Sequence, residues 1–257
     1  MSENNKENEL AEFDPYQPNS ISLFEALYGK NLISLGGLAA IDNMFTDLNL
    51  IGLKALDLGF GLGGVAFYLA EKYKMNIAGI EVHPWMVEYA IEHTPAGLSN
   101  SLGFNTYNSI GQLPYKPETF DLVYSKGVLN HVADKASLFH QINSVLKPYG
   151  LFVIADWIYP EAIIESSAPL VCETKESYEQ ILLDSGFSEI SFRNDSKLFF
   201  HYAKELLIRM ANNQTFIKQK YGEELFISIQ KQHLELIEKI QQYQKSATRI
   251  VAKKVSY

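Results

Sequence analysis

The stretch Ala55-Leu56-Asp57-Leu58-Gly59-Phe60-Gly61-Leu62-Gly63-Gly64 decides the fold of this chain. An apolar strand carries one acid and then runs into four glycines within six positions. A helical pattern begins directly after the glycines. Because glycine has no Cβ, the backbone N–H groups of such a turn can approach a ligand closely. The stretch therefore predicts the nucleotide-binding corner of an α/β fold.

Strand and helix patterns alternate along the chain after this corner, which favours a Rossmann-like α/β sheet with helices on both faces. We expect seven strands, mostly parallel, with an antiparallel last strand. The expected strands are Leu53–Leu58, Asn76–Glu81, Phe104–Tyr107, Phe120–Ser125, Leu151–Asp156, Glu189–Arg193 and Arg249–Val255. The expected helices are Ile21–Tyr28, Leu38–Leu48, Gly64–Tyr73, Pro84–Glu92, Asp134–Leu146, Lys175–Ser185 and an interrupted stretch over Leu198–Gln244.

The length of 257 residues suits one α/β domain with an appended lid rather than two large domains. The stretch Met1–Asn8 is polar and acidic. We expect a disordered tail over residues 1–14, before a single domain over residues 15–257. Within that domain we expect lid helices at 15–48 and a cofactor-binding core at 49–156. Residues 157–257 would supply an acceptor-side lid, the C-terminal helices and the last strands.

Composition excludes several classes of partner. The net charge is −8 and only three arginines are present, so we expect no nucleic acid partner. No apolar run approaches the roughly 18 residues of a membrane span, and one cysteine, Cys172, fits a cytoplasmic chain. The histidines show no metal-ligand spacing, so no metal is expected. The apolar stripe of Leu225–Tyr243 is expected to pack internally, and both a monomer and a homodimer remain open.

The D-L-G-x-G-x-G form of the corner favours S-adenosylmethionine (SAM) as the cofactor. A loose G-x-G-x-x-G leaves a nicotinamide or flavin cofactor as the alternative. Glu81 closes the second strand, where a carboxylate can accept both hydroxyls of a ribose. The ordered motifs that follow resemble those of class I SAM-dependent methyltransferases. They are Leu113-Pro114-Tyr115, Phe120–Ser125, Leu129-Asn130-His131 and Leu146-Lys147-Pro148-Tyr149-Gly150.

This resemblance implies a set of cofactor contacts around the corner. The adenine would lie against the apolar side chains of Val82 and Ile110. Ser109, or Asn108 beside it, stands where the family often has an aspartate that touches the adenine amino group, so a neutral residue would replace that acid. The remaining expected contacts come from the corner and the second strand, namely Asp57, Gly59, Gly61, Gly63 and Glu81.

A second segment, Tyr28-Gly29-Lys30-Asn31-Leu32-Ile33-Ser34-Leu35-Gly36-Gly37, makes the likeness narrower. Together with the corner it resembles the phosphoethanolamine N-methyltransferases and related small-amine methyltransferases. In that family a tyrosine and a histidine act together at the methyl acceptor, and the matching positions are Tyr16 and His131. The resemblance also implies cofactor contacts from Ile33 and Ser34. Lys126 stands where the family often has an arginine that touches cofactor or substrate.

The chemistry of methyl transfer suits these residue types. An in-line displacement gains much of its rate from positioning, and an amine must be uncharged to attack, so a histidine near its usual pKa can take the proton. Aromatic faces favour a cationic amine product, and the expected acceptor-side residues are Phe24, Tyr28, Trp157 and Tyr159. We therefore expect methyl transfer to a small polar acceptor, most simply at nitrogen, with S-adenosylhomocysteine (SAH) as the second product.

Two alternatives to this function remain open from the sequence, and the class of amine is open as well. The acceptor could be an aromatic or quinone-like molecule methylated at oxygen or carbon, or the chain could bind SAM without catalysis. Within the amine class, the segment Glu165–Cys172 lacks the arginine and lysine with which phosphoethanolamine enzymes bind phosphate. A phosphate dianion would need such charge-assisted bonds. A less highly charged amine is therefore at least as consistent with the sequence as phosphoethanolamine.

Overall fold

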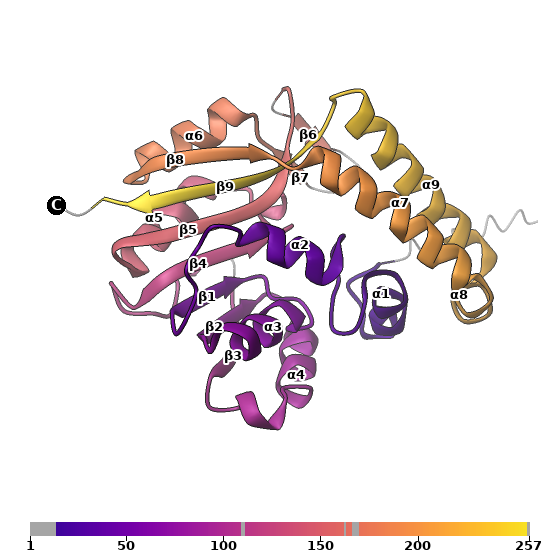
Figure 1. Ribbon diagram of the computed structural model, residues 1–257, viewed down its shortest axis with the longest axis horizontal. Helices are drawn as coiled ribbons and strands as arrows, with labels where there is room; N and C mark the ends of the chain where they lie inside the picture. The colour runs from indigo at the N-terminus through magenta and orange to yellow at the C-terminus, as the bar shows by residue number, and fades with distance from the viewer. Residues whose placement is uncertain (1–13, 109–110, 162, 166–169, 256–257) are drawn as a thin grey trace, which may run out of the picture.

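The computed structural model describes residues 14–108, 111–161, 163–165 and 170–255. Seven strands form one sheet in the order β3-β2-β1-β4-β5-β9-β8 (Figure 1). These strands are β1 (Lys54–Leu58), β2 (Asn76–Glu81), β3 (Leu102–Thr106), β4 (Phe120–Lys126), β5 (Leu146–Ile158), β8 (Phe187–Asn194) and β9 (Ser246–Lys254).

The strand directions match the expected class of fold. β1 pairs in parallel with β2 and β4, and the sheet continues in parallel to β3 on one side and β5 on the other. β9 is antiparallel to both β5 and β8, so it is the one strand of this sheet that runs against the other six. The prediction of a Rossmann-like α/β sheet with an antiparallel last strand is confirmed.

Helices cover the sheet and extend beyond one side of it. In Figure 1, α2 lies in front of the sheet, α5 and α6 lie behind it, and α7 and α9 project to the right above α1. The helices are α1 (Ile21–Tyr28), α2 (Gly37–Met44), α3 (Gly64–Tyr73), α4 (Pro84–Glu92), α5 (Lys135–Val145), α6 (Lys175–Asp184), α7 (Ser196–Asn212), α8 (Gln214–Tyr221) and α9 (Glu223–Gln241). Within the described ranges, no helix is long and apolar enough to cross a membrane.

Both faces of the central strands are buried, which explains their nearly continuous apolar sequences. Along β1, Ala55 belongs to the core under α2, α3 and α4, whereas Leu56 and Leu58 belong to the core under α5 and α6. A third core joins α1 to α7, α8 and α9, and it includes Leu23, Leu27, Leu206, Met210, Ile217, Phe226 and Ile229. Four residues of the expected stripe, Phe226, Ile229, Ile237 and Ile240, are buried within the chain, whereas Tyr243 at its far end is 82% exposed.

Several element boundaries differ from the sequence-based expectation. β5 begins at Leu146, where a helix was expected to end, because Leu146 already pairs with Phe120 of β4. α2 ends at Met44 rather than Leu48, and the turn that follows holds Asp47 at a φ of +67°. No strand was expected between β5 and α6, but the structure has a short antiparallel pair there, β6 (Ile163–Glu165) with β7 (Leu170–Cys172).

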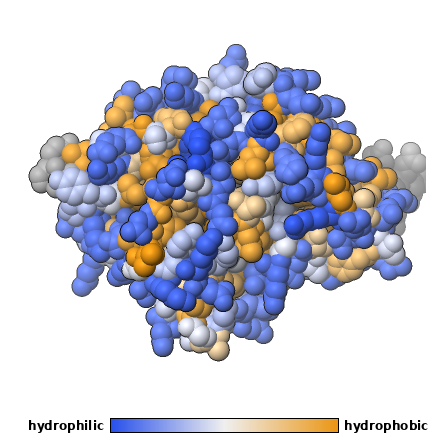
Figure 2. All heavy atoms as spheres, in the orientation of Figure 1, coloured by the Kyte–Doolittle hydropathy of each residue, from blue (hydrophilic) through white to orange (hydrophobic). Residues whose placement is uncertain are grey.

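The molecular surface is mostly polar on the face shown in Figure 2. Hydrophilic side chains cover much of that face, and apolar side chains are exposed only in scattered patches between them. Scattered apolar exposure of this kind is normal for a folded chain. The polar side chains that could bind a ligand lie at the carboxyl ends of strands β1, β2, β4 and β5.

Candidate functional site

The glycine corner joins β1 to α3 and is tied to β2. The Gly59 N–H donates to the Ile80 carbonyl at 2.8 Å. Gly61, at a φ of +58°, donates its N–H to Glu81 Oε2 at 3.1 Å. A side chain disfavours this left-handed backbone region, so glycine suits the position. The corner is thus bonded directly to the acid that closes the second strand.

Glu81 is a fixed carboxylate at the carboxyl edge of the sheet, and only 7% of it is exposed. Its Oε1 atom accepts from the N–H groups of Val82 and His83 at 2.8 and 3.3 Å, and contacts His83 Nδ1 at 3.0 Å. Val82 beside it is half exposed. A held carboxylate next to an open apolar side chain suits a ribose and the base attached to it.

Asp57 lies beneath the corner rather than facing it. The residue is 3% exposed, and Tyr124 donates its hydroxyl to Asp57 Oδ2 at 2.9 Å. Burial raises the pKa of Asp57 to about 7; the Tyr124 hydrogen bond opposes this rise and the charge of Glu81 adds to it. The expected cofactor contact of Asp57 stays a prediction, and in the structure this carboxylate accepts a hydrogen bond from β4.

The segment of residues 31–35, here called the roof segment, covers the glycine corner. The Gly64 N–H donates to the Asn31 carbonyl at 3.1 Å. A Cβ added at Gly61 would lie 2.5 Å from Ile33 Cδ1, so Ile33 packs directly on that glycine. The chain's own N-terminal region therefore closes one side of the corner, as the predicted contacts of Ile33 and Ser34 require.

Lys126, at the end of β4, holds the roof segment in place. Its ammonium donates to Ser34 Oγ at 2.5 Å and to the Leu35 carbonyl at 3.2 Å. Burial lowers the pKa of Lys126 to about 8, and the charge of Asp156 opposes this change. The expected contact of Lys126 with cofactor or substrate stays a prediction, and in the structure its ammonium bonds to the roof segment.

The two residues expected to act on the acceptor, Tyr16 and His131, meet at this edge of the sheet. Their ring centroids lie 6.2 Å apart in an edge-to-face arrangement. Burial raises the pKa of the Tyr16 hydroxyl, and Glu81 and Asp14 add to the rise. Desolvation lowers the pKa of His131, with Asp156 opposing and His83 adding to the effect. The imidazole is therefore neutral at neutral pH.

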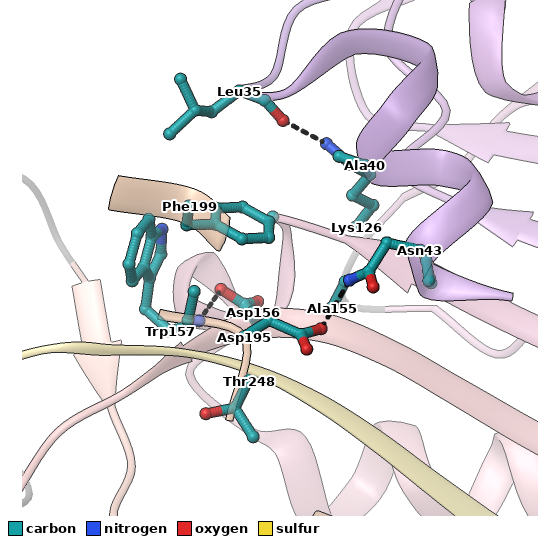
Figure 3. A pocket seen from close by; sticks show the side chains of 13 residues that line it. Leu35, Ala40, Asn43, Lys126, Ala155, Asp156, Trp157, Asp195, Phe199 and Thr248 are labelled. Carbon is teal, nitrogen blue, oxygen red and sulfur yellow. Dashed lines mark hydrogen bonds between the residues drawn. The ribbon is translucent and has the colours of Figure 1, made fainter. Parts of the chain in front are cut away.

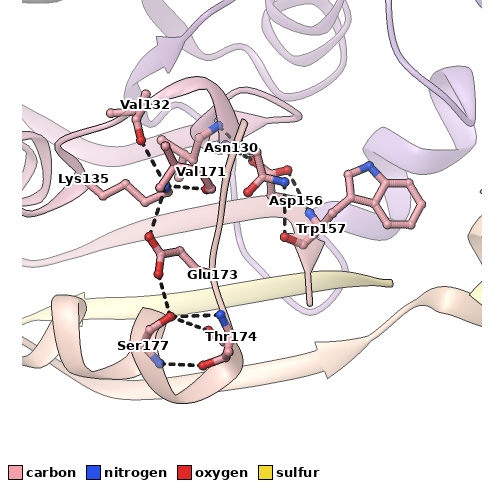
Figure 4. A network of polar contacts seen from close by, with 10 residues as sticks. Asn130, Val132, Lys135, Asp156, Trp157, Val171, Glu173, Thr174 and Ser177 are labelled. Atoms are coloured by element: carbon pink, nitrogen blue, oxygen red, sulfur yellow. Dashed lines mark hydrogen bonds and ion pairs between the residues drawn. The ribbon is translucent and has the colours of Figure 1, made fainter. Parts of the chain in front are cut away.

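Asp156, at the carboxyl edge of β5, was not singled out in the sequence and supports the His131 turn. Its Oδ2 atom accepts from the N–H groups of Leu129 and Asn130 at 2.9 and 3.3 Å, and Oδ1 accepts from Trp157 N at 2.8 Å (Figure 4). Burial raises the pKa of Asp156, and these three bonds oppose that rise. Asp156 is an acid near the carboxyl end of a parallel strand, and Glu81 was singled out by the same kind of position.

The aromatic residues expected near the acceptor fall into two groups. Phe24 and Tyr28 lie together in α1 with ring centroids 6.3 Å apart, and burial raises the pKa of Tyr28 to about 12. Trp157 lines a cavity of about 60 Å³ together with Lys126, Asp156, Asp195 and Phe199 (Figure 3). Lys245 Nζ lies 4.8 Å from the Trp157 ring centroid and 5.2 Å from that of Tyr159.

A buried lysine anchors the hairpin beyond β5. Lys135 Nζ donates to the carbonyls of Val132 and Val171 at 3.0 and 2.8 Å and pairs with Glu173 at 3.3 Å (Figure 4). Ser177 then donates to Glu173 at 2.6 Å. These bonds satisfy the Lys135 ammonium in full, so it holds structure rather than facing a ligand.

Two expected cofactor residues, Ser109 and Ile110, lie outside the described residues. Among the residues that the structure does describe, no three His, Cys, Asp or Glu side chains are grouped as a metal site would require.

A model of the family Methyltransf_31, whose description is "Methyltransferase domain", matches residues 51–222. The chain belongs to this family of methyltransferase domains. The matched range contains the glycine corner, Glu81 and His131, and it ends at the boundary between α8 and α9. The prediction of a class I SAM-dependent methyltransferase is confirmed.

Curated relatives place this methyltransferase near one group of enzymes. It is 29% identical over 223 residues to phosphoethanolamine N-methyltransferase 1 of Arabidopsis thaliana, covering 81% of this chain and 45% of that one. It is 27% identical over 241 residues to phosphoethanolamine N-methyltransferase of Plasmodium falciparum, covering 85% and 89%. The chain spans less than half the length of the plant relatives that it matches.

Solved structures share the fold. Phosphoethanolamine N-methyltransferase 2 of Haemonchus contortus, in complex with phosphomonomethylethanolamine and SAH, superposes with a TM-score of 0.84 at 22% identity, covering 94% of this chain and 59% of that one. A putative sarcosine dimethylglycine methyltransferase of Galdieria sulphuraria gives a TM-score of 0.81 at 17% identity, covering 93% and 98%. At these identities the likeness concerns the fold alone.

Proposed function

We propose that this methyltransferase moves a methyl group from SAM to the amine nitrogen of a small polar acceptor. The observation that carries the proposal is the edge-to-face meeting of Tyr16 and His131 above the corner, at 6.2 Å between ring centroids. These two residues come from segments more than a hundred positions apart. They meet at the carboxyl edge of the sheet, which is where open α/β folds bind ligands.

The residues around the corner fit a SAM molecule. Glu81 is positioned for the ribose hydroxyls, and the open side chain of Val82 is positioned for the adenine. The glycine turn leaves room beside the backbone where the methionine part would lie, and Ile33 with Ser34 closes that side. When bound, SAM supplies a methyl group on a positively charged sulfur.

Acid–base roles follow from the protonation states of the pair. An ammonium has no free electron pair, so the acceptor nitrogen must lose a proton before it can attack. Because the pKa of His131 is lowered, its ring is neutral near pH 7 and can accept that proton. Because the pKa of Tyr16 is raised, its hydroxyl stays protonated and can orient the imidazole or the acceptor by donating a hydrogen bond.

The class of amine is the finer part of the proposal. The curated relatives are phosphoethanolamine N-methyltransferases, which favours phosphoethanolamine as the first acceptor to test. Two features favour a less highly charged amine: the segment Glu165–Cys172 contains no arginine or lysine, and Lys135 is engaged by Glu173 and two carbonyls. The acceptors to be tested therefore include phosphoethanolamine and less highly charged amines.

The test is methyl transfer by the purified chain with SAM and four acceptors: phosphoethanolamine, ethanolamine, sarcosine and a catechol. SAH formation gives the rate, and mass spectrometry locates the added methyl group. We expect an N-methylated product from at least one amine and a strong loss of rate in His131→Ala. Turnover of the catechol alone would contradict the amine proposal. SAM binding without turnover of any acceptor would support a non-catalytic SAM-binding protein.

A further inference from the structure

The first turn of α4 contacts both halves of the proposed site. His83 Nδ1 lies 3.0 Å from Glu81 Oε1, and the same ring stacks on Tyr16 with centroids 5.2 Å apart and planes inclined by 14°. Two residues further on, Trp85 donates its indole N–H to the Tyr16 carbonyl at 3.0 Å. Helix α4 therefore holds Tyr16 by its ring and by its backbone.

The His83 ring is not explained by the needs of the helix. His83 occupies the N-cap position of α4, where Ser, Thr, Asp and Asn side chains usually accept hydrogen bonds from the first turn. Its side chain makes no such cap bond, and Pro84 follows at the first helical position. The imidazole turns away from the helix instead, toward Glu81 on one side and Tyr16 on the other.

These contacts form one continuous path across the site. The Gly61 N–H bonds to Glu81, Glu81 contacts His83, His83 stacks on Tyr16, and the Tyr16 ring meets His131. The first members belong to the proposed cofactor site and the last two to the proposed acceptor site. His83 is the member that touches both groups.

We propose that His83 is a positioning residue that couples the ribose-binding carboxylate of Glu81 to the placement of Tyr16. The inference rests on the proposed function, in which Glu81 binds the cofactor and Tyr16 acts at the acceptor. A ribose that hydrogen-bonds to Glu81 adds to the backbone bonds that already hold this carboxylate. The added bond steadies the imidazole that contacts Glu81, and the stacked Tyr16 ring follows. Because coupling between sites is reciprocal, a well-placed Tyr16 also favours the cofactor-bound arrangement.

Trp85 offers a readout that does not depend on any acceptor. The chain has two tryptophans, so Trp157→Phe leaves Trp85, which is bonded to the Tyr16 carbonyl, as the only indole. We expect saturating SAH to lower iodide quenching of Trp85 by about twofold, because the Tyr16 segment then covers it more firmly. In the same background, His83→Ala should still bind SAH but lose most of this protection.

Two further variants separate the contacts of the ring. His83→Phe keeps an aromatic face for Tyr16 and loses the nitrogen that contacts Glu81. In this variant Trp85 should be protected from iodide quenching, and SAH should not change that protection. His93→Ala is the matched control, because His93 also stacks on a tyrosine of α4, Tyr89, with centroids 3.8 Å apart. His93 lies at the other end of the helix, and its removal should leave the SAH response of Trp85 unchanged.

A kinetic cycle tests the same coupling with the acceptor that the enzyme turns over. We expect His83→Ala to lower kcat about tenfold in the parent chain but less than about twofold in a Tyr16→Phe background. Equal losses in both backgrounds, or full SAH protection of Trp85 in His83→Ala, would overturn the coupling while leaving the proposed function intact. Failure of the parent chain to bind SAH would instead overturn the proposed function itself.

Discussion

Replacing Asp57 by asparagine should raise the free energy of unfolding above that of the parent chain, and this gain should be larger at alkaline than at acidic pH. The Asp57 carboxyl is buried beneath the glycine corner, and burial raises its pKa from 3.8 to about 7. The folded state therefore binds this proton more tightly than the unfolded state. As the pH rises above 3.8, folding must give up a proton from a buried group, and the free energy of unfolding falls until the pH passes 7.

The size of the effect follows from the two pKa values. A difference of about three pKa units corresponds to roughly 4 kcal/mol once the carboxyl is ionised in both states. With the folded pKa at about 7, the penalty is on the order of 2 kcal/mol at pH 5 and about 4 kcal/mol at pH 8. Asparagine keeps an acceptor for the Tyr124 hydroxyl, and its packing effects do not depend on pH, so they cancel when the two pH values are compared. The advantage of Asp57→Asn should therefore grow by roughly 2–3 kcal/mol between pH 5 and pH 8.

Urea unfolding of the parent and variant at pH 5 and pH 8 measures this difference. Asp121→Asn is the control, because partial burial at Asp121 is outweighed by the hydrogen bonds from Lys147 and the Lys54 N–H, which lower its pKa. The stability that Asp121 contributes is lost only below pH 3.8, so its variant should show no change between pH 5 and pH 8. An equally flat result for Asp57→Asn would refute the buried-acid reasoning.

Three other predictions concern the site itself. Gly61→Ala, whose Cβ would lie 2.5 Å from Ile33 Cδ1, should weaken SAM binding about tenfold or more by calorimetry. His131→Gln should lower kcat far more than SAM affinity, and equal losses in rate and affinity would indicate a structural role. In the parent chain, the acidic limb of the plot of kcat against pH should lie below pH 6.5, because the pKa of His131 is lowered. Lys126→Met, which removes the bonds to Ser34 and the Leu35 carbonyl, should speed limited proteolysis of the roof segment, and unchanged cleavage would argue against this attachment.

The sheet and its corner were predictable because their signals are local. Four glycines after an apolar strand, and an acid at the end of the next strand, specify a turn and a carboxylate without knowledge of distant residues. The family-like Tyr28–Gly37 segment also indicated a cover for the corner. Ile33 does pack on Gly61, although the sequence could not show which atoms make the contact.

Long-range polar contacts were not predictable in the same way. Lys126 and Ser34 are 92 positions apart, and nothing in either segment indicates that the ammonium turns to the roof segment rather than to a ligand. Asp57 and Tyr124 are separated by 67 positions, and their pairing follows from the register of β1 with β4. The sequence assigned no role to His83, because a histidine two positions after an acid carries no signal until Tyr16 is placed beside it.

The position of β9 makes the fold depend on its final strand. β9 follows the other six strands of the sheet in sequence, yet it lies inside the sheet, paired along one side with β5 and along the other with β8. During synthesis, β5 and β8 leave the ribosome with open edges that only residues 246–254 can close. A product truncated before Ser246 would leave one edge of β5 open and β8 without its neighbour in the sheet, and unpaired strand edges are templates for aggregation. The enzyme's sheet is therefore completed only when translation has passed Lys254.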